Sequence, residues 1–142
     1  MKKLFTFFAV FAMATSLTAQ TPKANLIKEW ERARAYTKEY LEAMPETGYA
    51  LKPTKEMRSF AGQMLHIADA NYGIVGTATE VAPTVKDLEK SNDVVKESVT
   101  EKVLASYDFA INAIKNYPDS KWAEMIKLFN RFDVTRGQVI DK

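Results

Sequence analysis

The chain contains no cysteine and only one histidine among its 142 residues. The absence of cysteine excludes a disulfide framework and any thiolate chemistry from the protein itself. A lone imidazole cannot by itself build a metal site or a Ser-His-Asp relay. A catalytic or metal-binding role for this histidine, His66, therefore needs partner groups other than histidines of this chain.

Glycine and proline are also scarce, with five of each, and the prolines fall between segments of helical periodicity. The sequence has no internal repeat and no low-complexity tract. Neither GYALK nor GTATE has the glycine spacing or the Lys-Ser/Thr ending of a phosphate-binding loop. These absences favour α-helices as the main elements of the fold.

The first nineteen residues have the pattern of a secretory signal peptide. Two lysines precede an apolar run from Leu4 to Ala14, and Ala19 stands before an expected cleavage site at Gln20. The run is too short for a membrane anchor, and no cysteine near the cut could carry a lipid. We therefore expect an exported protein, periplasmic or secreted, whose mature domain spans residues 20–142.

The mature chain would carry no net charge. Removing the two lysines of the signal leaves 18 Lys and Arg against 18 Asp and Glu. Because no basic stripe remains, nothing points to nucleic acid or, after signal removal, to a membrane surface as a partner. A single domain of 123 residues without disulfides must be stabilised by its packed core.

Three long helices are predicted from apolar residues that recur every three or four positions. The first spans about residues 24–44, and the third runs from about residues 91–93 to Pro118. The second spans about residues 55–77, with Thr54 as its N-cap. The core-facing stripe predicted for the second helix contains Met57, Phe60, Met64, Ile67, Asn71 and Val75.

Two further segments are not simple helices. Residues 77–93 form a polar, proline-containing excursion whose length is typical of a functional or mobile loop. Residues 120–133 have apolar bulk but poor helical periodicity, so we expect an irregular or partly extended connector with buried side chains. Thr135, followed three residues later by Gln138, is a capping box that predicts the start of a fourth helix. Only seven residues follow Thr135, too few for an independently stable helix.

His66 lies roughly 150° away from the centre of the stripe predicted for the second helix. Its neighbours on the helix are small: Ser59, Gly62, Ala70 and Gly73. Two interpretations stay open. His66 either faces solvent or faces a cavity, where Asp69 could orient one of its ring nitrogens. The two glycines, which each cost about 1 kcal/mol of helix stability relative to alanine, favour the cavity.

Residues 30–73, WERARAYTKEYLEAMPETGYALKPTKEMRSFAGQMLHIADANYG, resemble proteins of the DinB/YfiT-like superfamily, in particular its exported members. SYDFAINAIKN and KLFNRFDVTRGQVIDK continue the resemblance, which covers essentially the whole mature chain. It implies an all-α fold, a DinB-like four-helix bundle, with the fourth helix truncated here to its first turns. It also implies that the chain could form a homodimer, because family members often dimerise through bundle faces.

In that family three histidines hold a divalent metal, usually zinc or nickel. His66 matches the ligand from the second helix, and the resemblance makes it the single remaining candidate metal ligand, with Asp69 behind it. The other two ligands come from an H-x-x-x-H spacing on the fourth helix. The resemblance implies metal-assisted hydrolysis or thiol transfer on an unknown small-molecule substrate, with the metal lowering the pKa of a bound water or thiol.

This chain departs from the family pattern because it lacks the second and third histidines. In one alignment, residues 136–138 are the RGQ that follows the family's histidines, so Arg131 and Thr135 stand where ligands belong. In the other, residues 129–142 are the connector and first turn that precede the histidine-bearing helix. The capping box at Thr135 favours the second alignment. Either way the metal site is expected to be incomplete, with no metal bound stably.

Three functional hypotheses follow from this departure. The first is a DinB-like exported protein whose complete form binds a divalent metal. The second is a non-catalytic helical binding or scaffold module that has lost the metal site, and a lesser third is a sensor or dimerisation domain. A three-helix remainder would leave an apolar groove open to water. We therefore expect the isolated chain to fold poorly or to self-associate through that groove.

Overall fold

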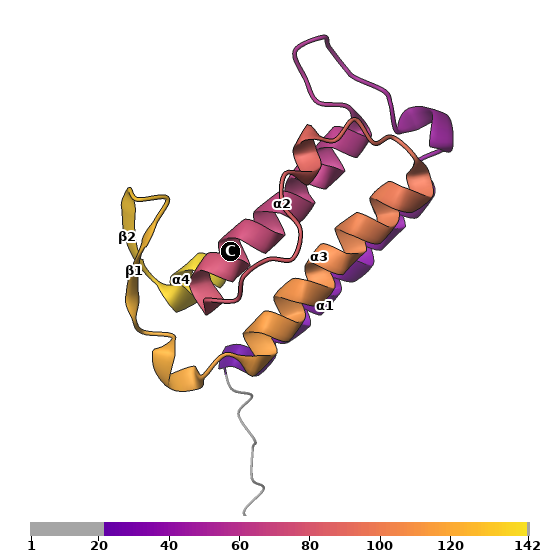
Figure 1. The fold of residues 1–142 in the computed structure, drawn as a ribbon. Helices are drawn as coiled ribbons and strands as arrows, with labels where there is room; N and C mark the ends of the chain where they lie inside the picture. The colour runs from indigo at the N-terminus through magenta and orange to yellow at the C-terminus, as the bar shows by residue number, and fades with distance from the viewer. Residues whose placement is uncertain (1–21, 142) are drawn as a thin grey trace, which may run out of the picture.

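The computed structural model describes residues 22–141, which form a mostly helical bundle with one small β-hairpin (Figure 1). The long helices are α1 (Pro22–Ala43), α2 (Phe60–Thr79) and α3 (Lys96–Asn116). The short elements are η1 (Glu46–Gly48), η2 (Leu88–Lys90), η3 (Asp119–Lys121), β1 (Met125–Leu128), β2 (Phe132–Thr135) and α4 (Arg136–Ile140). The all-α prediction with a short fourth helix is confirmed. The predicted signal peptide lies outside the described residues.

Helix α3 is the centre of the bundle and packs against α1 on one side and α2 on the other. Figure 1 shows α1 running alongside α3, with α4 and the hairpin gathered at one end of α2. Helix α4 contacts α2 and both strands. Over the range that the structure describes, every helix falls short of the length or apolar character that a membrane span needs.

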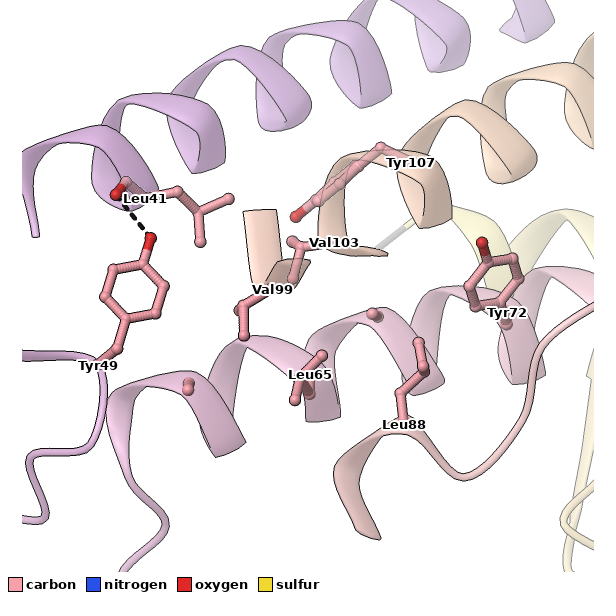
Figure 2. Close-up of a cluster of buried hydrophobic side chains, with 10 residues drawn as sticks. Leu41, Tyr49, Leu65, Tyr72, Leu88, Val99, Val103 and Tyr107 are labelled. Carbon is pink, nitrogen blue, oxygen red and sulfur yellow. Dashed lines mark hydrogen bonds between the residues drawn. The ribbon is translucent and has the colours of Figure 1, made fainter. Parts of the chain in front are cut away.

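The core divides into two apolar clusters along α3. The first lies towards the loop that joins α1 to α2 and is drawn in Figure 2. Its buried members are Leu41, Tyr49, Ala61, Leu65, Ala68, Tyr72, Leu88, Val99, Val103 and Tyr107. The second lies at the other end and joins α2, α3 and α4. Its buried members are Val75, Ala78, Ala110, Ala113, Ile114, Val139 and Ile140.

The core-facing stripe predicted for α2 was wrong by about one position. The buried side follows Ala61, Leu65, Ala68 and Tyr72, whereas Met64 is only partly buried at its edge. The prediction gave weight to the largest side chains, but alanines face α3 because they allow the two helices to approach closely. Of the predicted stripe, Val75 is buried and Asn71 donates to Ser106 of α3 at 3.0 Å, whereas Phe60, Met64 and Ile67 are only partly buried.

Helix α2 also begins later than predicted. Ser59 is its N-cap and accepts a hydrogen bond from the Gly62 N–H at 3.0 Å, so Thr54 is not the cap. Residues 44–59 instead form a loop around the fully buried Tyr49, whose ring packs edge-on against Phe60. Met57, predicted to be in the core, is 53% exposed. Burial of Tyr49 holds the chain in this loop and delays the first helical turn.

Helix α3 begins at Lys96, a few residues after the predicted start. The delay follows from Asp93, whose carboxylate accepts hydrogen bonds from the Val95 N–H at 3.0 Å and the Ser98 hydroxyl at 2.6 Å. The Lys102 ammonium donates to the same carboxylate. Asp93 therefore lies before the helix and anchors its first turns. The helix ends near Pro118, as predicted.

The segment after α3 is an antiparallel hairpin with Ile126 opposite Val134. This confirms the expected extended connector only in part, because the side chains are less buried than predicted. Ile126, Leu128 and Val134 pack on the second core cluster, whereas Phe129 at the turn is 71% exposed. A two-stranded sheet has one outer face that remains in water.

Candidate functional site

His66 lies on α2 on the side turned away from α3. Its side chain is 41% exposed, so the imidazole is neither fully solvated nor enclosed in a cavity. The segment between α2 and α3 runs back along α2 (Figure 1), and a Cβ at neither Gly62 nor Gly73 would contact it. The turn η2 of that segment packs on α2, and its residue Glu89 contacts the imidazole.

Glu89, in η2, is the hydrogen-bond partner of the histidine. His66 Nδ1 and Glu89 Oε2 are 2.5 Å apart, and Arg58 Nη2 donates to the same oxygen at 3.0 Å. The hydrogen bond from His66, together with the nearby charge of Arg58, holds the pKa of Glu89 below its ordinary value. Sequence analysis had marked residues 77–93 as a functional or mobile excursion but had not singled out Glu89.

Asp69 supports η2 from the neighbouring turn of α2. Its Oδ1 accepts a hydrogen bond from the Leu88 N–H at 3.0 Å, and its Oδ2 accepts one from the Glu89 N–H at 2.7 Å. Both carboxylate oxygens therefore bind backbone, and the Nδ1 partner of His66 is Glu89. The expected metal-supporting role of Asp69 stays a prediction.

The residues around His66 do not fit a metal ion. Among residues 22–141, no group of three His, Asp or Glu side chains lies close enough to hold one. The nearest carboxylate to the ring, Glu89, is shared with the cation Arg58, which would have to be displaced. One imidazole and one shared carboxylate fall short of the three protein ligands usual for a catalytic zinc site. His66 as a metal ligand therefore stays a prediction.

The residues around RGQ distinguish the two alignments. Arg131 lies in the hairpin turn, and Thr135 is the N-cap of α4, with its hydroxyl accepting from the Gln138 N–H and the Gln138 amide accepting from the Thr135 N–H. The capping box is confirmed. Arg131 and Thr135 do not share a helix, so they lack the i, i+4 relation that a pair of helical ligands needs. The RGQ segment here begins a helix and does not follow one.

The second feature is a groove of about 430 Å³ between α1 and α2, which we call the α1–α2 groove. Its floor contains Tyr107 of α3, whose hydroxyl lies 2.9 Å from the Thr37 hydroxyl. At one end Trp30 Nε1 donates to the Ile140 carbonyl at 3.4 Å. The lining residues are Leu26, Glu29, Trp30, Arg32, Ala33, Tyr36, Asn71, Tyr107, Ile140 and Asp141. An open groove was predicted, and the structure places it between these helices.

The family model of the DinB superfamily matches residues 29–141, which is nearly all of the chain that the structure describes. A search of curated proteins and a search of solved structures returned no match. The matched span contains most of α1, all of α2 and α3, the turn with Glu89 and α4. This chain therefore belongs to the DinB superfamily.

Proposed function

We propose that this chain is a non-catalytic helical binding module of the DinB superfamily, with the α1–α2 groove as its binding surface. The observation that carries the proposal is the groove itself, whose volume of about 430 Å³ and aromatic lining are typical of binding sites. Around His66, in contrast, the described residues bond to one another through Glu89 and Asp69 and include no group of three possible metal ligands.

An amphipathic helix is the occupant that this groove fits best. The last turn of α4 reaches the end of the groove, where Ile140 and Asp141 form part of the lining. Glu29 and Arg32 on the rim pair with each other, so the rim has little net charge. Apolar residues at positions i, i+3, i+4 and i+7 of the occupant would supply most of the contact.

The alternative function is metal-assisted hydrolysis or thiol transfer on zinc or nickel, in a complete form of the site. A bound metal would lower the pKa of a water or thiol. The observation in its favour is that His66 Nε2 has no hydrogen-bond partner among the described residues, which leaves one ring nitrogen available. Two further ligands would be needed, and His66 is not among the residues that line the α1–α2 groove.

Export is part of the proposal as well, with residues 1–19 as the signal. Expression of the full chain in a bacterium should give a periplasmic or secreted product that starts at Gln20, and intact mass measures this directly. A product that retains residues 1–19 would contradict the export proposal without bearing on the groove.

The binding test uses a synthetic amphipathic peptide with Leu and Ala on one helical face and Lys and Glu on the other. Fluorescence of Trp30 should change on binding, and a peptide of the same composition with a scrambled stripe should have no effect. Tyr36 and Tyr40 provide a matched pair, because both are exposed on α1 but only Tyr36 lines the groove. Tyr36→Ala should weaken binding about threefold to tenfold, and Tyr40→Ala should leave it unchanged.

Equal losses in the two tyrosine variants, or no binding of the striped peptide, would contradict the proposal. Sedimentation of the full chain over a range of concentrations tests self-association, the competing use of the groove. If a homodimer forms and Tyr36→Ala weakens it while Tyr40→Ala does not, the occupant is a second copy of the chain and not a separate helix.

A further inference from the structure

The segment from Glu80 to Val95 is attached to α2 through the turn η2. Leu88, the first residue of η2, is only 7% exposed and belongs to the first core cluster (Figure 2). The rest of the turn lies at the surface, where backbone N–H groups would otherwise be hydrated. The turn therefore has one apolar anchor inside the bundle and needs polar contacts outside it.

Asp69 caps η2 from another element. The residue in the N-cap position, Asp87, has a positive φ of 61° and makes no side-chain cap hydrogen bond. The carboxylate of Asp69 instead accepts from the N–H groups of Leu88 and Glu89 at 3.0 and 2.7 Å. A carboxylate that accepts backbone N–H groups at the start of a helical turn forms charge-assisted hydrogen bonds, which are stronger than neutral ones. Asp69 therefore orients the turn on α2.

The orientation set by Asp69 carries Glu89 to the imidazole. Glu89 Oε2 lies 2.5 Å from His66 Nδ1 and 3.0 Å from Arg58 Nη2, so two cationic or donating groups meet on one oxygen. The side chains of His66 and Glu89 are 41% and 33% exposed, which makes the contact partly shielded from solvent. We define Arg58, His66, Asp69 and Glu89 together as the η2 clasp.

We propose that His66 acts in this chain as an anchor for the Glu80–Val95 segment, through the hydrogen bond between its Nδ1 and Glu89. Arg58 strengthens the arrangement, because a cation that entered beside His66 would have to separate Arg58 from Glu89 or bind next to its positive charge. Asp69 is a positioning residue, since it acts on His66 only through the turn that carries Glu89. A metal at His66 would have to bind Nε2, and the residues that the structure describes bring no second and third ligand to it.

Four amides report on the clasp. The N–H groups of Leu88 and Glu89 donate to Asp69, that of Lys90 donates to the Asp87 carbonyl, and that of Ser91 donates to the Leu88 carbonyl. Hydrogen exchange of these amides, measured by NMR on the full chain at neutral pH, follows opening of the turn. Amides in the middle of α3 serve as the internal reference for global stability.

His66→Ala and Glu89→Gln should each speed exchange of the four amides about twofold to fivefold, the size expected of partly exposed ion pairs. Asp69→Ala should speed exchange of Leu88 and Glu89 about tenfold or more, because it removes two charge-assisted hydrogen bonds. The matched control is Glu101→Gln, an exposed carboxylate on α3 without a partner among residues 22–141, which should change nothing.

Zinc titration of the full chain tests whether His66 binds a metal. Calorimetry and the NMR signals of His66 follow the titration. The clasp predicts the same weak or absent binding in the wild type and in His66→Ala. Stoichiometric zinc binding that is lost in His66→Ala would overturn the inference. It would also be overturned if His66→Ala and Glu89→Gln left exchange of the four amides as it is in Glu101→Gln.

Discussion

Arg136, the first residue of α4, donates a hydrogen bond from Nη1 to the carbonyl of Ala78 near the end of α2 at 2.9 Å. The same guanidinium reaches Glu80 Oε1 at 2.7 Å and Glu124 Oε2 at 3.1 Å. Its side chain is 10% exposed. One buried cation thus caps α2, joins it to α4 and pairs with two carboxylates at this end of the bundle, of which Glu80 also pairs with Lys121.

Replacement of Arg136 by Ala should lower the free energy of unfolding by about 2–3 kcal/mol, because it leaves buried carbonyls without donors. Urea denaturation followed by circular dichroism measures the change. Lys115→Ala, an exposed cation in the last turn of α3, is the control and should stay within about 0.5 kcal/mol of the wild type. A similar loss in both variants would mean that Arg136 acts only through its charge.

Tyr49 completes the end of α1. Residue 45 is a proline without an N–H, so the carbonyl of Leu41 lacks its normal helical donor, and the Tyr49 hydroxyl donates to it at 2.8 Å. Tyr49→Phe should cost about 1–2 kcal/mol of unfolding free energy, because a buried carbonyl is left unsatisfied. Tyr40→Phe, at a tyrosine that is 69% exposed, should cost almost nothing in the same denaturation assay. Equal stability of the two variants would argue against the capping role.

The start of α3 should be sensitive to acid. Hydrogen bonds from Lys102 and then from Ser98 lower the pKa of Asp93 from its ordinary 3.8 to about 2. Since the folded-state pKa is depressed, the stabilisation is complete above about pH 4 and is lost as the pH falls towards 2. Asp93→Asn should therefore be less stable than the wild type by about 1–2 kcal/mol at neutral pH, and the difference should shrink below pH 4.

Denaturation of Asp93→Asn and the wild type at a series of pH values measures this difference. Asp133→Asn serves as the control, because Asp133 is 68% exposed and lies 3.7 Å from Lys127. A stability gap for Asp93→Asn that is independent of pH down to 2.5 would show that the carboxylate charge is not what anchors α3.

Two glycines of α2 should respond to alanine in opposite directions. A methyl group at Gly73, on the same side as His66, would meet no atom within 4 Å, whereas one at Gly76 would lie 2.8 Å from the Val81 carbonyl. Gly73→Ala should stabilise the protein by about 0.5–1 kcal/mol through helix propensity. Gly76→Ala should destabilise it by about 1–3 kcal/mol, because backbone must move. Thermal melts compare the pair, and a shift of the same sign in both would refute this account.

The sequence predicted the number of long helices, the extended segment before α4 and the capping box at Thr135. These features depend on residue types at short spacings, where the interacting groups are neighbours whatever the rest of the chain does. The core-facing side of α2 was predicted only in part, because close contact with α3 selects the small Ala61 and Ala68 over the larger Met64. Helix starts were missed where Tyr49 and Asp93 hold the preceding chain out of helical geometry.

The candidate site, too, was predicted from the sequence only in part. The sequence identified His66 and the small residues around it, since both follow from helical periodicity. It did not identify Glu89, which is 23 positions away and meets His66 only because the Glu80–Val95 segment folds back over α2. Nor did it show that Asp69 binds the backbone of that segment. A turn at the surface has no periodic pattern that would indicate which of its carboxylates faces a helix.

The amino-acid sequence alone determined the helical class, the start of α4 and membership of the family whose model matches residues 29–141. Only the tertiary structure decided which groups satisfy the helix ends and the imidazole: Arg136 at α2, Tyr49 at α1 and Glu89 at His66. Contacts within one helical turn follow from backbone geometry. Contacts between elements depend on helix packing, which sets how close residues far apart in the sequence come to each other.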